Sequence, residues 1–330
     1  MKSLRALRCH DPRDRVYALM SICGDAKRLD IVADYSPSNT VYNLSLSLTQ
    51  QLMDANINML IDVSLSRRPN ATISTPSWAL PLIYEDDYSP PTTFDEVFYP
   101  HPNRTWMSPP HFDMESEPPV LTIKGRILDT ASMILKRAVA DEDGTGSMTD
   151  CMGKICGILL ESNVSEDIVS NLAHALLWLD YRMDTEDFDS AYYLWCLCRD
   201  YITTPGLSEA VARSCAALIP KLEAMCPDAR AENVGPAWEK FEQSMLPAIK
   251  TSMEGRSFCY SESKHFCNTM HELEPLDLIA AFQGANCLYV LRPVGERFRL
   301  IGDAYVAGWM FSEAYEGLNY EEVDYDIEII

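Results

Sequence analysis

The stretch from Thr75 to Pro119 most constrains what this chain can fold into, because prolines interrupt it throughout. They stand at positions 76, 81, 90, 91, 100, 102, 109, 110, 118 and 119. Proline fixes φ and has no backbone N–H to donate, so this density excludes a helix and a central strand. Yet the stretch is rich in Trp, Tyr and Phe, which disordered linkers lack. We therefore predict a long, ordered, irregular segment that covers the core.

Helical spacing of apolar residues dominates most of the remaining chain. Asp11-Pro12 and Ser38 each begin a segment whose apolar residues recur three or four positions apart. Further helices are predicted over residues 127–140, 148–161, 165–181, 185–201, 208–225 and 234–253. Short strands are predicted over residues 120–124, 278–282, 288–291 and 298–306, between glycine and proline turns. The expected fold is α+β, mainly α-helical with a small antiparallel β-sheet near the C-terminus.

Three segments follow from this pattern. Residues 1–120 hold N-terminal helices and the proline- and aromatic-rich cover, residues 121–254 a helical bundle, and residues 255–330 the small sheet and an acidic tail. The tail ends in Ile-Glu-Ile-Ile, so it either packs or frays. With 330 residues, 47% of them hydrophobic, the chain can bury a large core. We expect one compact unit.

The charge balance argues against two classes of partner. Lys and Arg number 27 and Asp and Glu 49, a net charge of −22. Such a surface repels nucleic-acid phosphates and anionic lipid, so neither nucleic acid nor membrane is expected as a partner. No run approaches the roughly 20 apolar residues that span a bilayer, and residues 1–15 contain no signal-peptide core. The cytosol or nucleus is expected, with the cytoplasm as our prediction.

The sequence contains no recognisable cofactor or metal motif. The eleven cysteines lie mostly in apolar stretches typical of reduced, buried thiols. They form no CxxC pair, and GxGxxG, Walker and HExxH motifs are lacking. We therefore predict neither metal nor cofactor. His265 and His271 lie near Cys259 and Cys267, but nothing shows the third group that would orient a Cys-His pair, so nucleophilic catalysis is disfavoured.

Three ordered groups of motifs resemble a known family. The first is DPRDRVYAL from Asp11 to Leu19, with Asp34-Tyr35-Ser36 and Pro76-Ser77-Trp78. The second is Leu121–Gly125 with Asp129. The third is Val290-Leu291-Arg292-Pro293, then LIGDAYV from Leu300 and GWMFSEA from Gly308. Together they are similar to the part of fungal heterokaryon-incompatibility (HET-domain) proteins that follows the effector domain.

The chain also departs from that family pattern. Only ten residues precede Asp11, so we expect the effector domain to be absent. Leu276 and Ser312 stand where the family has glycine, and Ala307 stands where it has histidine. The motif glycines Gly125, Gly302 and Gly308 are expected to supply special backbone conformations or close strand contacts.

Four aromatic residues are candidates for a substrate-binding site. Trp78 and Trp106 come from the proline-rich cover, and Tyr305 and Trp309 come from the closing sheet, so the two pairs are placed to face each other. Aromatic side chains usually fill a core. The alternative is an apolar pocket with a few polar groups, which is typical of small-molecule sites.

Arg292 is the fifth candidate because it lies on a predicted strand among apolar neighbours. A buried guanidinium needs carboxylate or carbonyl partners. The structural interpretation pairs it with Asp303 or Glu313, and the functional one makes it a clamp for a ligand's anion or carbonyl.

Two main functions follow from the resemblance and these residues. In the first, the scaffold has been recruited as a cofactor-independent cyclase or pericyclase of fungal secondary metabolism, such as an intramolecular Diels–Alder catalyst, acting on an apolar small molecule by preorganisation. Its catalytic residues remain unassigned. In the second, the chain is a non-enzymatic incompatibility or regulatory protein that binds another HET-family protein. A gene fragment without retained function is a third possibility.

Overall fold

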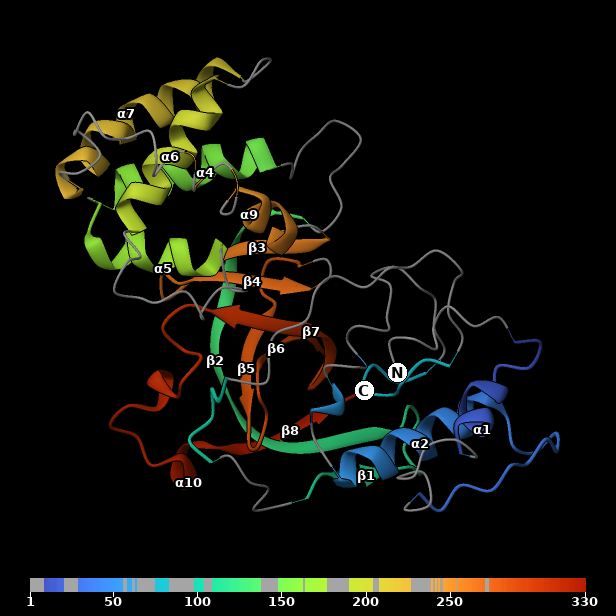
Figure 1. Ribbon diagram of the computed structural model, residues 1–330. Coiled ribbons are helices and arrows are strands. Elements are labelled where there is room, and N and C mark those ends of the chain that lie inside the picture. Colours follow the sequence, from blue (N-terminus) through green and yellow to red (C-terminus); the bar gives the residue numbers. More distant parts are fainter. Residues whose placement is uncertain are drawn as a thin grey trace.

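The computed structural model combines a helical layer with one extensive sheet (Figure 1). It describes residues 9–20, 29–55, 58–60, 63, 75–82, 98–103, 109–137, 148–162, 164–176, 190–203, 208–226, 239, 241, 243, 246–253, 255–270 and 273–330. Helices are α1 Asp14–Met20, α2 Val41–Ala55, α4 Met148–Glu161, α5 Glu166–Leu176, α6 Ser190–Thr203, α7 Glu209–Met225, α9 Leu246–Met253 and α10 Tyr320–Val323, with a 3-10 turn at Glu313–Tyr315. Strands are β1 His111–Asp113, β2 Val120–Lys136, β3 Arg256–Ser261, β4 Phe266–Met270, β5 Leu278–Phe282, β6 Leu288–Val294, β7 Arg297–Val306 and β8 Tyr325–Ile329.

The sheet closes on itself. Its strand order is β1-β2-β3-β4-β7-β6-β5, and β5 pairs again with β2, so six strands form a ring. Strand β8 pairs antiparallel with β2 and parallel with β7. The long strand β2 makes this possible, because successive parts of it pair with β8, β5 and β3.

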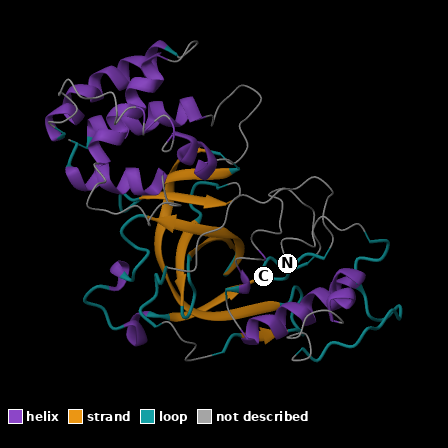
Figure 2. Ribbon diagram, viewed as in Figure 1, coloured by secondary structure: helices purple, strands orange, loops and turns teal. Residues whose placement is uncertain are grey.

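Helices α4 to α7 and α9 gather at the end of the sheet where β3 and β4 lie (Figure 2). Helix α6 is buried from Ala191 through Cys198, so it runs through the middle of the helical layer. Ser208 caps the N-terminus of helix α7, because its side chain accepts a hydrogen bond from the Val211 amide. These helices lie within residues 121–254, for which a helical bundle was predicted.

The prediction of a mainly helical fold with a small sheet is wrong, because the sheet has eight strands and begins at His111. Residues 127–136, predicted as helix, belong to β2. Three register shifts interrupt this strand and break the alternation of buried and exposed side chains. The buried residues in this part of β2 are Asp129, Ala131 and Leu135. Ala131 and Leu135 are four positions apart, which is the spacing of buried residues in a helix.

The sequence predicted some of the other helices and strands and missed others. Helix α4 and strand β5 have the predicted limits, whereas β3 and β4 were missed. Side chains on both faces of β3 are buried, so exposed and buried residues do not alternate along this strand. The C-terminal tail packs as β8, which settles the choice between packing and fraying. The sheet takes strands from all three predicted segments. None of the described helices is long and apolar enough to cross a membrane.

Parts of the proline-rich cover are tied to the sheet. The Ser77 hydroxyl donates to the Ile330 carbonyl and accepts from the Leu300 amide at 2.8 Å, so it joins the tail to β7. The Tyr99 amide donates to the Met310 carbonyl at 2.9 Å. These bonds tie the described residues Ser77 and Tyr99 to the C-terminal part of the chain.

Candidate functional site

Two of the predicted aromatic site residues lie in the core. Trp78 is fully buried, donates from Nε1 to the Pro119 carbonyl at 3.2 Å and packs on Phe112 with ring centroids 5.4 Å apart. Tyr305 is also buried and packs edge-on against Phe98 of the cover. These contacts favour the core-filling interpretation for both. Trp106 lies outside the described residues.

Arg292 is held by ion pairs. Its Nε and Nη2 bind the two carboxylate oxygens of Asp277 at 2.8 and 2.9 Å, and Nη1 binds Glu274 at 2.6 Å. A paired arginine was predicted, but with different partners. The ion pairs occupy the guanidinium and favour its structural role.

Asp303, one of the partners predicted for Arg292, instead faces a different arginine. It lies 3.5 Å from Arg256, whose Nε donates to the Asn268 side chain at 2.6 Å. All three side chains are fully buried. Burial lowers the pKa of Arg256, and the Asp303 carboxylate opposes that shift.

Among the predicted aromatic residues that the structure describes, Trp309 has access to solvent. It is half-buried, and its ring lies 4.2 Å from the half-buried imidazole of His265. Trp309 follows Gly308, whose φ of +83° turns the chain after β7 as the motif predicted. Helix α5 approaches here, because a Cβ at Gly308 would lie 3.8 Å from Asn171 Oδ1.

The half-buried imidazole of His265 interacts with the backbone of Ala307. Burial lowers its pKa, and the hydrogen bond to the Ala307 backbone and the nearby Asp129 carboxylate oppose that shift. His265 Nδ1 is buried and has no hydrogen-bond partner among the described residues. In the tautomer that is protonated at Nε2, Nδ1 would offer a lone pair that is shielded from water.

The position of His265 is fixed by the turn that precedes it. Asp129, on β2, accepts hydrogen bonds from the Ser263 amide at 3.2 and 3.3 Å. The His265 amide donates to Ser261 Oγ at 3.0 Å. Lys264 takes a left-handed φ of +69° to close the turn. Asp129, the polar residue of the second motif, thus positions the hairpin that carries the histidine.

A second histidine forms a closed polar cluster. His101 Nε2 lies 2.7 Å from Asp324 Oδ2, and its Nδ1 accepts from the Asn103 amide at 3.0 Å. Gln283 and Tyr315 also donate to Asp324, at 3.1 Å each. Both ring nitrogens are engaged, so this His–Asp pair joins the cover to the tail and is not poised for proton transfer.

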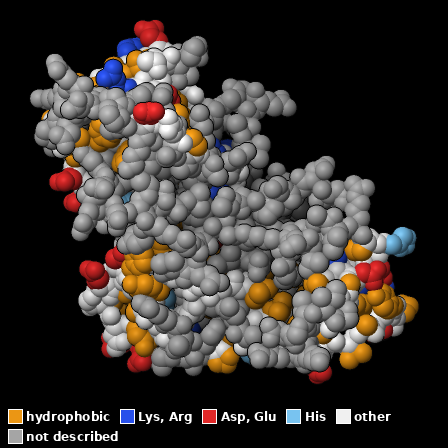
Figure 3. All heavy atoms as spheres, viewed as in Figure 1, with side chains coloured by type: hydrophobic (Ala, Val, Ile, Leu, Met, Phe, Trp, Pro, Cys, Tyr) orange, Lys and Arg blue, Asp and Glu red, His pale blue; other side chains and the backbone are white. Residues whose placement is uncertain are grey.

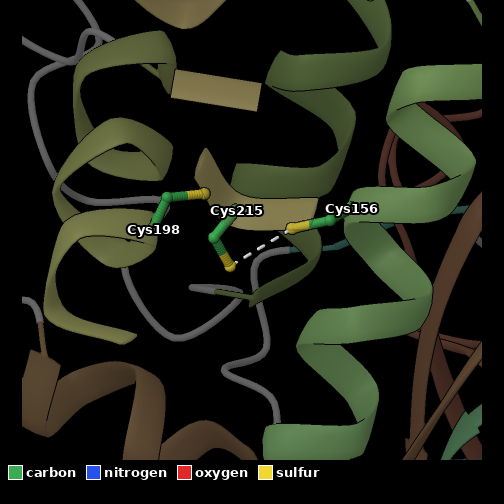
Figure 4. A group of neighbouring side chains, drawn as sticks. All are labelled: Cys156, Cys198 and Cys215. Carbon is green, nitrogen blue, oxygen red and sulfur yellow. Dashed lines mark hydrogen bonds between the residues drawn. The ribbon is translucent and has the colours of Figure 1, made fainter. Parts of the chain in front are cut away.

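Three buried cysteines form another cluster. Cys156, Cys198 and Cys215 come from α4, α6 and α7, and their Sγ atoms all lie within 4.8 Å of one another. Figure 4 shows the three side chains converging, with Cys156 and Cys215 3.6 Å apart. Hydrogen bonds from Cys156 and Cys198 hold the pKa of Cys215 well below its ordinary value. Their separations in the sequence gave no sign of this cluster.

Comparison with protein-family models, with curated proteins and with solved structures finds no match to this chain. Function must therefore be argued from the residues themselves. Acidic side chains lie at several separate places on the face shown in Figure 3, in keeping with the net charge of −22.

Proposed function

We propose that this chain is a HET-like scaffold that acts in the cytoplasm as a cofactor-independent cyclase. Trp309 and His265 would contact an apolar small molecule and promote bond formation within it. Trp309 supplies an aromatic surface, and His265 Nδ1 accepts a hydrogen bond or proton from a donor group of the substrate. A cycloaddition within one substrate, of the Diels–Alder type, needs this kind of positioning and no cofactor.

The observation that carries the proposal is the buried Nδ1 of His265, which has no hydrogen-bond partner in the part of the chain that the structure describes. A buried polar atom without a partner costs roughly 1–3 kcal/mol, and such atoms are few in folded proteins. A substrate hydroxyl or enol bound against Trp309 would supply the missing donor. Burial lowers the pKa of His265, which favours the neutral form of the imidazole that can accept a hydrogen bond.

The backbone supports the resemblance to HET-domain proteins. Leu276 and Ser312 replace family glycines, and both keep positive φ values, +75° and +72°. Side chains rarely adopt this conformation, so it fits positions that once held glycine. At the third departure, Ala307, the family's histidine is missing, yet the imidazole of His265 hydrogen-bonds the Ala307 backbone. One imidazole would thus replace another at this turn.

Native mass spectrometry tests the binding step. The purified chain is incubated with an organic extract of the source organism, and we expect one apolar compound to stay bound. Trp309→Ala should release it, whereas Tyr325→Ala, at an exposed aromatic on β8, should retain it. Retention by Trp309→Ala equal to that of the unmodified chain would refute this site.

Protein binding is the second candidate, favoured by an exposed apolar pair. Val32 is 79% exposed and Tyr35 52% exposed, within the loop that precedes α2. Single exposed apolar residues are ordinary, but two within one short loop suit a contact surface. Under this alternative, the chain incubated with an aqueous protein extract of the source organism would retain an effector-bearing HET protein in native mass spectrometry, and Val32→Asp would abolish that retention.

A further inference from the structure

The cluster of Cys156, Cys198 and Cys215 has the dimensions of a metal site. Metal–sulfur bonds of about 2.3 Å place neighbouring sulfurs roughly 3.8–4.0 Å apart in tetrahedral or trigonal geometry. The sulfurs here are separated by 3.6 Å in one pair and by no more than 4.8 Å in any pair. Small side-chain rotations therefore suffice to surround one ion.

Three helices hold these thiols in place. Exposure of Cys156 and Cys215 is 0%, and that of Cys198 is 1%. Each lies on a different helix, and α7 packs against both α4 and α6. The geometry is therefore set by helix packing and not by a flexible loop, which is how a preorganised site is built.

The ligand number indicates which metal fits. Zinc favours four ligands, and where a protein supplies three, water usually takes the fourth position. Among the described residues, no fourth His, Cys, Asp or Glu joins this group, and its burial excludes water. Soft thiolate ligands in a three-coordinate, dry site suit monovalent copper.

We infer that Cys156, Cys198 and Cys215 form a trigonal binding site for one Cu(I) ion within the helical layer. The site is separate from His265 and Trp309 and does not depend on the proposed cyclase activity. Its role is to join α4, α6 and α7. Metal binding stabilises the folded chain because the unfolded chain does not bring the three thiols together.

Copper binding by these thiols depends on pH. Each thiol that ionises on binding releases one proton, so the affinity of the chain for Cu(I) rises with pH.

The test is an anaerobic titration of the reduced full-length chain with Cu(I), with a chromophoric Cu(I) chelator as competitor. We expect one tightly held ion per chain, a thiolate-to-copper charge-transfer absorbance and a higher thermal unfolding midpoint. Cys156→Ala, Cys198→Ala and Cys215→Ala should each weaken binding at least tenfold. Cys151→Ala and Cys196→Ala are matched controls, since these buried cysteines lie on α4 and α6 outside the cluster. Both control variants should bind Cu(I) as tightly as the unmodified chain.

X-ray absorption at the copper edge keeps the test decisive if a variant fails to fold. Three sulfur neighbours at one distance in the unmodified chain support the site. Two sulfur neighbours, or equal loss of binding in Cys151→Ala and Cys215→Ala, overturn it. The inference is also overturned if the thiols form a Cys156–Cys215 disulfide on exposure to air while the reduced chain binds no copper.

Discussion

The imidazole of His101 donates to the carboxylate of Asp324 at 2.7 Å, and the two side chains are 0% and 2% exposed. This bond joins the proline-rich cover to the segment that leads into β8. Burial raises the pKa of Asp324, but hydrogen bonds from His101 and Gln283 outweigh this effect. The pKa of Asp324 therefore lies below the ordinary value for an aspartate. The carboxylate therefore stabilises the fold while it is ionised.

Asp324→Ala should lower the free energy of unfolding by about 3 kcal/mol near neutral pH, because it leaves buried donors unpaired. The pKa of this carboxyl is lower in the folded chain than in the unfolded chain. The stability that the carboxylate contributes is therefore fully present at a pH above the pKa of the unfolded chain, and it is lost as the pH falls through the pKa of the folded chain. The deficit of the variant should therefore shrink below about pH 4. Urea unfolding from pH 7 to 3 measures it. Asp326→Ala, which breaks an exposed pair with Lys124, should cost less than about 1 kcal/mol at every pH.

Gly125→Ala should destabilise the sheet, since a Cβ there would lie 2.3 Å from the Ala281 carbonyl oxygen on β5. We expect a loss of at least 1–3 kcal/mol, the usual range for overpacking. Gly157→Ala is the matched control, because nothing lies within 4 Å of its Cβ position on α4. That change should stabilise the chain by roughly 0.5–1 kcal/mol. Equal effects in chemical denaturation would contradict the close contact of β2 and β5.

Leu276→Gly should stabilise the chain by about 1 kcal/mol, because it relieves a leucine held at a φ of +75° and 68% exposed. Leu318→Gly replaces another exposed leucine, which does not have a positive φ, and should destabilise by roughly 0.5–1 kcal/mol. Thermal melts of the two variants give opposite shifts if the backbone at Leu276 is left-handed. A loss at Leu276 would argue against an ancestral glycine there.

Arg292→Met should cost about 3 kcal/mol, since it leaves Asp277, 1% exposed, without its bidentate partner. Arg297→Met removes an exposed pair with Glu328 and should cost less than about 1 kcal/mol. If Arg292 were a ligand clamp, its variant would keep its stability and lose ligand binding. Urea denaturation and native mass spectrometry of the same samples separate these outcomes.

The elements that the sequence predicted well share an uninterrupted pattern. Helix α4 keeps one apolar face throughout, and β5 lies between turn residues. Strand β2 was misread because bulges disturb its period, and β3 because both its faces are buried. Local patterns carry no information about such pairings, and this is why the closed sheet was missed.

The candidate sites were less predictable than the fold. Trp309 was singled out from a motif, but its contact with His265 depends on where a hairpin turn places the imidazole. Cys156, Cys198 and Cys215 meet only because three helices pack with a particular rotation. Neither grouping has a spacing in the sequence that could reveal it.

The most direct test of the proposed cyclase is conversion of a compound without a change in mass. An organic extract from the source organism lacking this gene is incubated with the purified chain and followed by liquid chromatography and mass spectrometry. We predict that one apolar component is replaced by an isomer of the same mass, because cyclisation within one molecule adds and removes no atoms. Trp309→Ala and His265→Phe should slow this at least tenfold, and Tyr325→Ala should not. If no component isomerises, or if the Trp309 and His265 variants act as fast as the unmodified chain, the proposed function is wrong.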